Sequence, residues 1–220
     1  MPRAKRSLRQ FFDTLRAIHL LIISMPLLGT LGCSNRPSAI APPDIDPHTL
    51  AAAAVEQYDK SGDGIIDSKE LELAPSLRFS LDRIDANSDK KIAQDEITQF
   101  AQKHWVDTPT GIIRVQCVVN FKGRPLDSAL VTLEPEPFMQ GVVHPASGVT
   151  RGGTASLDVS DDARPHPNAH GVQMGLYRVR VSKLVNGKET IPAKYNEQSV
   201  LGCEVARRAS YMPGPIVFNL

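Results

Sequence analysis

Two acidic segments of twelve residues have the side-chain types and spacing needed to bind a cation. The first covers residues 59–70, with Gly64 at its sixth position and the apolar Ile66 at its eighth. Calcium loops place oxygen ligands at positions 1, 3, 5, 7, 9 and 12 and a glycine at position 6. Those ligand positions hold Asp59, Ser61, Asp63, the Ile65 carbonyl, Asp67 and Glu70. Because a divalent cation relieves the repulsion among these carboxylates, the segment predicts a calcium site in preference to a solvated acidic turn.

The second acidic segment, residues 85–96, follows the same pattern with two departures. Lys90 replaces the glycine, and Ala93 offers no side-chain ligand at the ninth position. A non-glycine residue at positive φ costs about 1 kcal/mol or more, and Lys90 adds positive charge beside the cation. The expected ligands are Asp85, Asn87, Asp89, the Lys91 carbonyl and Glu96. Both segments have the spacing of EF-hand loops, and the second is either a weaker calcium site or a structural partner that pairs through Ile92.

Short helices must position these two loops. Asp46 and Pro47 mark a helix start, with a capping side chain followed by proline at the first helical position, and the alanines after them extend the helix to the first loop. Pro75 stops the next helix, and Ser76 is expected to cap the one after it. These further helices are expected over residues 68–74, 76–84 and 93–105.

The resulting EF-hand pair, residues 47–106, favours a structural role for the ion over a sensor role. The first positions of the two loops are 26 residues apart, so the helices between them must be short. Calcium sensors expose a methionine-rich surface, but this chain has no methionine between Met25 and Met139. A calcium-regulated partner-binding protein is the alternative.

Residues 1–33 have the organisation of an export signal. Basic residues come first, and an apolar run of about 15 residues follows, shorter than the roughly 20 that a membrane helix needs. The run ends in Leu31-Gly32-Cys33, which resembles a bacterial lipoprotein box in which the cysteine is lipidated. We expect lipidation at Cys33, with ordinary secretion as the alternative, and a proline-rich tether over residues 34–46. The predicted location is the cell envelope, either anchored to a membrane or periplasmic or extracellular.

The pattern changes to a period of two after residue 109. Ile113, Val115, Cys117 and Val119 alternate with other residues, as in a half-buried strand. Short strands separated by turn signals predict an antiparallel Ig-like β-sandwich over residues 110–220, and the whole chain is expected to be α+β and multidomain. Further strands are expected at residues 129–134, 154–159, 177–182, 199–205 and 216–220.

Four segments of this β region carry a family resemblance: residues 120–126 (NFKGRPL), 129–135 (ALVTLEP), 175–181 (GLYRVRV) and 191–195 (IPAKY). They resemble the transthyretin-like, carboxypeptidase-regulatory-like β-sandwich of predicted bacterial lipoproteins, some of which carry a compact EF-hand pair just upstream. The resemblance implies an extracytoplasmic accessory or adhesive module without catalytic residues. Its expected partners are calcium, a membrane through the lipid anchor, and an unidentified cell-surface protein or glycan.

No motif indicates catalysis or nucleic-acid binding. His166 and His170 have the spacing of a helical metal pair, but Pro165 and Pro167 prevent the helix, so both are expected to be loop residues. The sequence has no nucleophile elbow, phosphate-binding loop or nicotinamide fingerprint. Its formal net charge of +1, without a basic stripe, argues against a nucleic-acid partner. We therefore expect a non-catalytic protein.

Cys117 and Cys203 both fall on the apolar phase of their expected strands. In an exported chain such a pair can form a disulfide in the core, worth about 3 to 5 kcal/mol, but two buried thiols fit the pattern as well. A carbohydrate-binding module is the remaining alternative function and would need an exposed aromatic strip. The aromatic residues, however, are expected to pack in the core or in turns: Phe121, Phe138, Tyr177 and Phe218.

Overall fold

The computed structural model describes residues 40–108, 110–207 and 214–220. The expected export signal, Cys33 and the first part of the tether, residues 34–39, lie outside this range. The described residues belong to one compact unit. In the described part of the chain, no helix has both the length and the apolar character that a membrane crossing requires.

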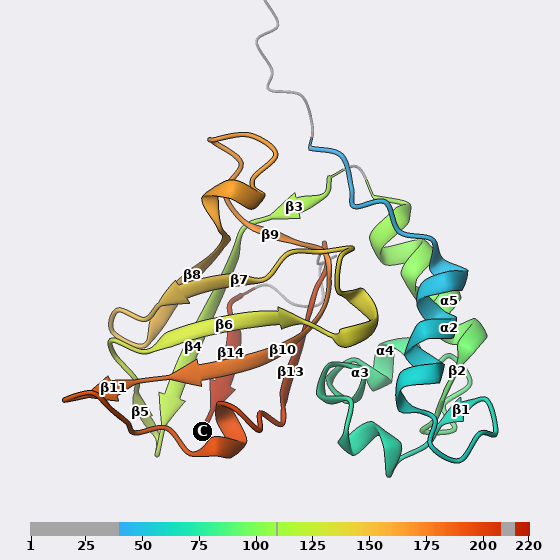
Figure 1. The fold of residues 1–220 in the computed structure, drawn as a ribbon, viewed down its shortest axis with the longest axis horizontal. Helices are drawn as coiled ribbons and strands as arrows, with labels where there is room; N and C mark the ends of the chain where they lie inside the picture. The colour runs from blue at the N-terminus through green and yellow to red at the C-terminus, as the bar shows by residue number, and fades with distance from the viewer. Residues whose placement is uncertain (1–39, 109, 208–213) are drawn as a thin grey trace, which may run out of the picture. The chain divides into compact units, whose positions relative to one another are not determined.

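The helical part of the chain comes first. The helix α2 (Pro47–Tyr58) begins as expected, because the Asp46 side chain accepts a hydrogen bond from the His48 N–H at 3.1 Å. The helices α2 and α5 lie side by side (Figure 1). The remaining helices and turns are short: α3 (Pro75–Phe79), α4 (Leu81–Ile84), α5 (Gln94–Ala101), the 3-10 turn η1 (Glu70–Glu72) and the π turn η2 (Gln102–Val106).

Several expectations about the middle helices are wrong. Residues 68–74 contain only the 3-10 turn η1 where a helix was expected. Pro75 was expected to stop a helix, but it is the first residue of α3, and Ala74 is the cap residue before it. Ser76 lies inside the first turn, and its buried hydroxyl has no hydrogen-bond partner among the described residues. The helix expected over 76–84 is divided at Ser80 into α3 and α4. Proline at the first helical turn needs no hydrogen-bonded N–H, so Pro75 is compatible with a helix start.

The β region folds mainly into one curled eight-stranded sheet (Figure 1). Its order is β13-β10-β6-β7-β8-β4-β14, with β5 paired to β4. Neighbouring strands are antiparallel, as expected, except that β14 runs parallel to β4. The strands are β4 (Val115–Phe121), β5 (Arg124–Pro125), β6 (Leu130–Pro135), β7 (Ala146–Val149), β8 (Thr154–Val159), β10 (Gly175–Ser182), β13 (Leu201–Val205) and β14 (Ile216–Asn219).

Three two-stranded pairs complete the β structure. Two of them come from segments of the β region that connect to strands of the large sheet. They are β3 (Ile112–Ile113) with β9 (Val172–Gln173), and β11 (Leu184–Val185) with β12 (Lys188–Glu189). The third joins the two acidic loops: β1 (Ile65–Ile66) with β2 (Ile92–Ala93).

Helices and sheet share a single hydrophobic core. Buried side chains from both belong to one cluster, although the secondary structure changes near residue 107. The close packing of α3 on β13 requires a glycine, because a Cβ at Gly202 would lie 2.2 Å from the main chain of Pro75. Tyr177 and Phe218 are buried, as expected, and Phe121 and Phe138 are partly buried against the core. These aromatic residues therefore do not form an exposed strip.

Cys117 and Cys203 are both fully buried, and the structure has no disulfide between them. Cys117 lies on β4 and Cys203 on β13, and four strands separate these two in the order of the sheet. Burial raises the pKa of the Cys117 thiol to about 11, so this group stays protonated and unreactive at neutral pH. Of the two alternatives left open by the sequence, the buried thiols are the one observed.

Candidate functional site

The glutamate at the twelfth position closes each acidic loop from inside. Oε1 of Glu70 accepts hydrogen bonds from the N–H groups of the second and third loop residues at 2.7 and 2.9 Å, and Oε2 accepts from the ninth at 2.9 Å. Glu96 repeats this arrangement, with distances of 2.9, 3.4 and 2.9 Å. Each glutamate is only 7 % exposed. A buried carboxylate with several N–H donors is a fixed negative group inside each loop.

The aspartates at the first and fifth positions also make equivalent contacts in the two loops. Asp59 and Asp85 each accept a hydrogen bond from the N–H of the sixth loop residue, at 2.7 and 2.8 Å. Asp63 and Asp89 each accept one from the N–H of the seventh, at 3.0 and 2.9 Å. The two loops therefore have the same main-chain course, repeated after 26 residues.

The strands β1 and β2 join the two loops as an antiparallel pair, with Ile66 opposite Ile92 and Ile65 opposite Ala93. Both eighth-position residues, Ile66 and Ile92, are fully buried. The pairing that the sequence predicted through Ile92 is present. It places the two acidic loops next to each other on one hydrogen-bonded unit.

The backbone at the fourth and sixth loop positions adopts positive φ in both loops. At the sixth position Gly64 has φ +82° and Lys90 has φ +64°, and at the fourth Gly62 has +77° and Ser88 has +63°. Glycine takes this conformation without steric penalty, whereas Lys90 and Ser88 do not. The second loop thus follows the course of the first at a conformational cost.

The acidic side chains are directed at the N–H groups of their own loops. Within residues 40–108, 110–207 and 214–220, no three His, Cys, Asp or Glu side chains come together as a metal-binding group. The hydrogen bond from the Gly64 N–H is the largest effect that lowers the pKa of Asp59, and the one from the Glu70 N–H is the largest that lowers the pKa of Asp67. These two carboxylates are therefore ionised at neutral pH. The other oxygens at the expected ligand positions belong to a hydroxyl, an amide and two carbonyls: Ser61, Asn87, Ile65 and Lys91.

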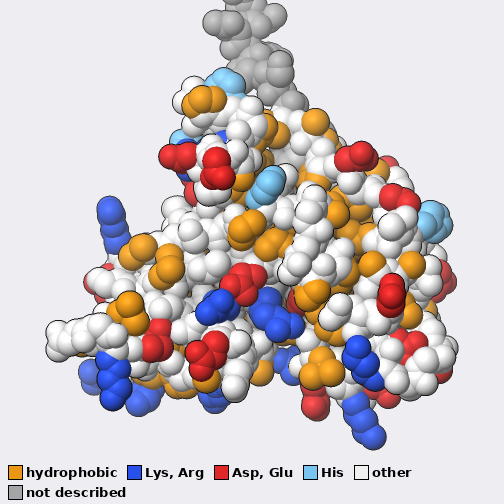
Figure 2. All heavy atoms as spheres, viewed as in Figure 1, with side chains coloured by type: hydrophobic (Ala, Val, Ile, Leu, Met, Phe, Trp, Pro, Cys, Tyr) orange, Lys and Arg blue, Asp and Glu red, His pale blue; other side chains and the backbone are white. Residues whose placement is uncertain are grey.

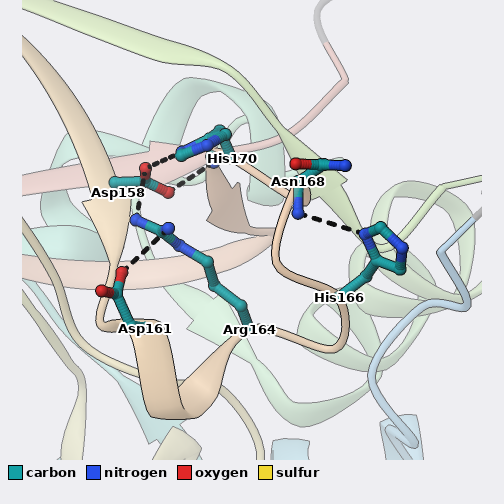
Figure 3. A network of polar contacts seen from close by, with 7 residues as sticks. Asp158, Asp161, Arg164, His166, Asn168 and His170 are labelled. Carbon is teal, nitrogen blue, oxygen red and sulfur yellow. Dashed lines mark hydrogen bonds and ion pairs between the residues drawn. The ribbon is translucent and has the colours of Figure 1, made fainter.

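A second polar cluster lies where β8 ends (Figure 3). Asp158 accepts a hydrogen bond from the Gly171 N–H at 2.7 Å and lies 2.6 Å from His170 Nδ1 and 2.9 Å from Arg164 Nη2. Arg164 also pairs with Asp161 at 2.8 Å. Burial by itself raises the pKa of Asp158, but the hydrogen bonds from Gly171 and His170 and the charge of Arg164 outweigh it and lower the pKa. Because these partners all follow β8 in the chain, the cluster holds that segment to the sheet.

Asp158 and His170 of this cluster line a hollow at the surface. The hollow has a volume of about 650 Å³ and is also lined by Ser156. Among these described residues, however, no hydrogen bond joins the Ser156 hydroxyl to His170, as a nucleophile and its base would require. His166 lies in a loop, as expected, and its Nδ1 accepts a hydrogen bond from the Asn168 N–H at 3.1 Å (Figure 3). The contact of His170 with Asp158 had no signal in the sequence, because the two residues are brought together by the turn between them.

Acidic and basic side chains are mixed over the face of the molecule drawn in Figure 2. Such a face has no extended field of one sign. Comparisons with protein families, with curated proteins and with solved structures found no match to this chain. The two acidic loops and the elements around them are therefore the features of this chain that bear on its function.

Proposed function

We propose that this chain is a calcium-binding, non-catalytic protein of the cell envelope, in which a pair of EF-hand loops lies beside a transthyretin-like β-sandwich. One observation carries the proposal. The same set of carboxylate to N–H contacts recurs in residues 59–70 and 85–96, and β1 and β2 join the two loops.

The donor set fits a hard divalent cation. All the expected ligands are oxygens, and most of the side chains among them are carboxylates, which calcium prefers. A carboxylate oxygen that accepts one N–H keeps a second lone pair that can face a cation. In the first loop the ligands would be Asp59, Ser61, Asp63, the Ile65 carbonyl, Asp67 and Glu70; in the second they would be Asp85, Asn87, Asp89, the Lys91 carbonyl and Glu96. A bound ion would supply positive charge that offsets the repulsion among these carboxylates.

A structural role for calcium is favoured over a sensor role. The helices between the two loops, α3 and α4, have five and four residues, so they present no long apolar groove. They also pack against the sheet, with α3 contacting β13 and β10. Calcium would then rigidify a helical unit that already has a neighbour on its apolar side.

The calcium proposal is tested by calorimetric titration of residues 34–220, which contain the whole compact unit. We expect two sites, with the tighter one lost in Asp59→Ala and the weaker one lost in Asp85→Ala. Asp82→Ala is the matched control, because Asp82 lies on α4 outside both loops. Absence of binding heat from the unmodified protein at millimolar calcium would contradict the proposal.

The envelope location depends on residues outside the described range and has its own test. Cys33 is the proposed lipid attachment point, at the end of the export signal. Stable membrane binding needs an acyl anchor together with a second signal. Loss of the cysteine removes the acyl anchor, so the chain should be released from the membrane. On cell fractionation, Cys33→Ser should move from the membrane to the soluble fraction. An unchanged membrane fraction would contradict the anchor.

A further inference from the structure

A buried glutamate of the sheet contacts the residue that leads into the first loop. Glu136, which follows β6, is fully buried, and its Oε2 accepts a hydrogen bond from the Tyr58 hydroxyl at 2.6 Å. Tyr58 is 3 % exposed and is the last residue of α2, directly before Asp59. Its ring packs edge-on against Phe138, with 6.1 Å between centroids. The first ligand position of the loop is therefore one residue from a fixed side chain.

The same carboxylate is linked to the segment that leaves the loop. Arg178 Nη2 lies 3.7 Å from Oε2 of Glu136 and donates a hydrogen bond to the Leu73 carbonyl at 3.2 Å. Leu73 directly follows the turn η1, which begins at Glu70. The other oxygen of this carboxylate, Oε1, accepts a hydrogen bond from the Ser76 N–H at 3.3 Å. Glu136 and Arg178 thus contact the segments on both sides of the first loop, residues 59–70: Tyr58 directly before it and Leu73 three residues after it.

The second loop has a counterpart on the neighbouring strand. Arg83, two residues before Asp85, forms an ion pair with Glu204 of β13, which is 4 % exposed. The two glutamates lie on either side of Leu176 in β10: the Glu136 N–H donates to the Leu176 carbonyl at 3.1 Å, and Glu204 is opposite Leu176 in the strand register. One end of the sheet therefore places a buried carboxylate in contact with a residue just before each loop: Tyr58 before the first and Arg83 before the second.

We infer that Glu136 is a positioning residue for calcium binding by the first loop, acting through Tyr58 and Arg178. The inference rests on the proposed calcium function. Calcium ligands must be held in place for high affinity, and a loop whose two ends are fixed loses less conformational freedom on binding. Because binding couplings are reciprocal, a site that depends on this contact will in turn stabilise it when calcium binds. The sheet then sets the affinity of a site that lies outside it.

The test is a calcium titration by calorimetry of the full chain in detergent. All variants carry Asp85→Ala, which leaves only the first loop to bind. Glu136→Gln keeps the shape of the side chain and removes its charge. Glu134→Gln is the matched control, since Glu134 lies two residues earlier and its ion pair with Arg180, at 2.8 Å, is exposed to solvent (39 % and 40 %). We expect Glu136→Gln to weaken calcium binding about tenfold and Glu134→Gln to leave it unchanged.

A readout of stability separates positioning from a merely structural role. If Glu136 only stabilises the fold, the variant unfolds at a lower urea concentration in chelator while its folded form binds calcium as tightly as before. That result, or an equal loss of affinity in the Glu134→Gln control, would overturn the inference.

If Glu136→Gln does not fold, Tyr58→Phe decides the question. It removes only the hydroxyl that donates to Glu136 and keeps the packed ring. It should weaken calcium binding several-fold, and unchanged affinity would overturn the inference. Absence of binding in the Asp85→Ala chain itself would mark failure of the proposed function, and the inference would fall with it.

Discussion

The two acidic loops have the same main-chain course but different side chains at eight of the twelve positions, the sixth and the ninth among them. The sixth residue is Gly64 in the first loop and Lys90 in the second, and the ninth is Asp67 in the first and Ala93 in the second. The closing contacts and the β1–β2 pair are nonetheless equivalent. The course of the loops is therefore set by their terminal carboxylates and by the β1–β2 pairing. The residues that differ should therefore alter calcium affinity more than they alter structure.

The largest effect should come from the closing glutamates. Glu70→Gln or Glu96→Gln replaces a carboxylate that accepts three N–H groups with a neutral amide. Each variant removes from the twelfth position the carboxylate that would bind calcium, so calcium affinity of the altered loop should fall on the order of 100-fold. Calorimetric titration of each variant measures this loss.

The two glutamine variants should also differ from each other. Glu70→Gln should remove the tighter site and leave only weak binding, whereas Glu96→Gln should leave the tighter site in place. Equal residual binding in the two variants would show that the loops do not differ as ranked.

A smaller effect is expected from exchanging the residue types at the sixth position. Lys90→Gly removes the backbone strain of a residue with a side chain at φ +64°. Gly64→Ala introduces the same kind of strain at φ +82°. No atom lies within 4 Å of a Cβ placed at Gly64, so only backbone strain is introduced there. We expect Lys90→Gly to gain, and Gly64→Ala to lose, about 1 kcal/mol of unfolding free energy, measured by urea unfolding in chelator.

The calcium affinity of the second loop should also rise in Lys90→Gly, because a positive charge leaves the neighbourhood of the cation. Lys60→Gly is a useful control, since Lys60 lies in the first loop at a position without positive φ. A loss of stability in Lys90→Gly would mean that other contacts of the lysine outweigh its backbone strain.

A further gain should follow from supplying the missing ninth ligand. Ala93 is the residue before α5 and makes no side-chain cap contact, whereas its counterpart Asp67 accepts hydrogen bonds from the N–H groups of Lys69 and Glu70 at 2.8 and 3.1 Å. Ala93→Asp adds both a cap and an oxygen near the cation. We expect about fivefold tighter calcium binding in the second loop. Ala93→Asn, a neutral cap, should give a smaller gain in the same titration.

Much of the fold could be predicted from local sequence signals. The Asp46 cap and Pro47 identified the start of α2, and the alternation of apolar residues located β8 at the predicted residues, Thr154–Val159. The spacing of the two loops predicted their pairing through Ile66 and Ile92. These features depend on residues close together in the chain, so the sequence alone carries them.

The remaining features depend on contacts between distant residues. In the sequence, Glu136 and Glu204 look like ordinary polar residues near strand ends. They are buried only because the helices pack on the sheet. The parallel pairing of β14 with β4 has no local signature, because either direction satisfies the same alternation. For the same reason the apolar phase of Cys117 and Cys203 could place both in the core without showing whether they meet.

The smallest expected effect distinguishes the two loops by pH. His104 lies beside Arg83, the residue that leads to the second loop, with 3.3 Å between Arg83 Nη2 and His104 Nδ1. Burial, and then the charge of Arg83, lower the pKa of His104 from 6.5 to about 4. As the pH falls through this interval, the unfolded chain binds a proton before the folded chain does, so stability decreases from pH 6.5 to about 4. After allowance for solvent screening this should amount to about 0.5 kcal/mol.

His104→Gln should therefore flatten the dependence of unfolding free energy on pH across this interval, as measured by urea unfolding at pH values from about 7 to about 4. His48→Gln is the control on the first-loop side, since His48 is an exposed residue in the first turn of α2. It should leave the dependence unchanged, because the His48 side chain is exposed to solvent, whereas that of His104 is packed beside Arg83. An equal flattening in both variants would show that acid acts on the chain as a whole. Flattening in His104→Gln alone would place a local acid-sensitive contact at the approach to the second loop, where the first loop has the neutral Tyr58 hydroxyl instead.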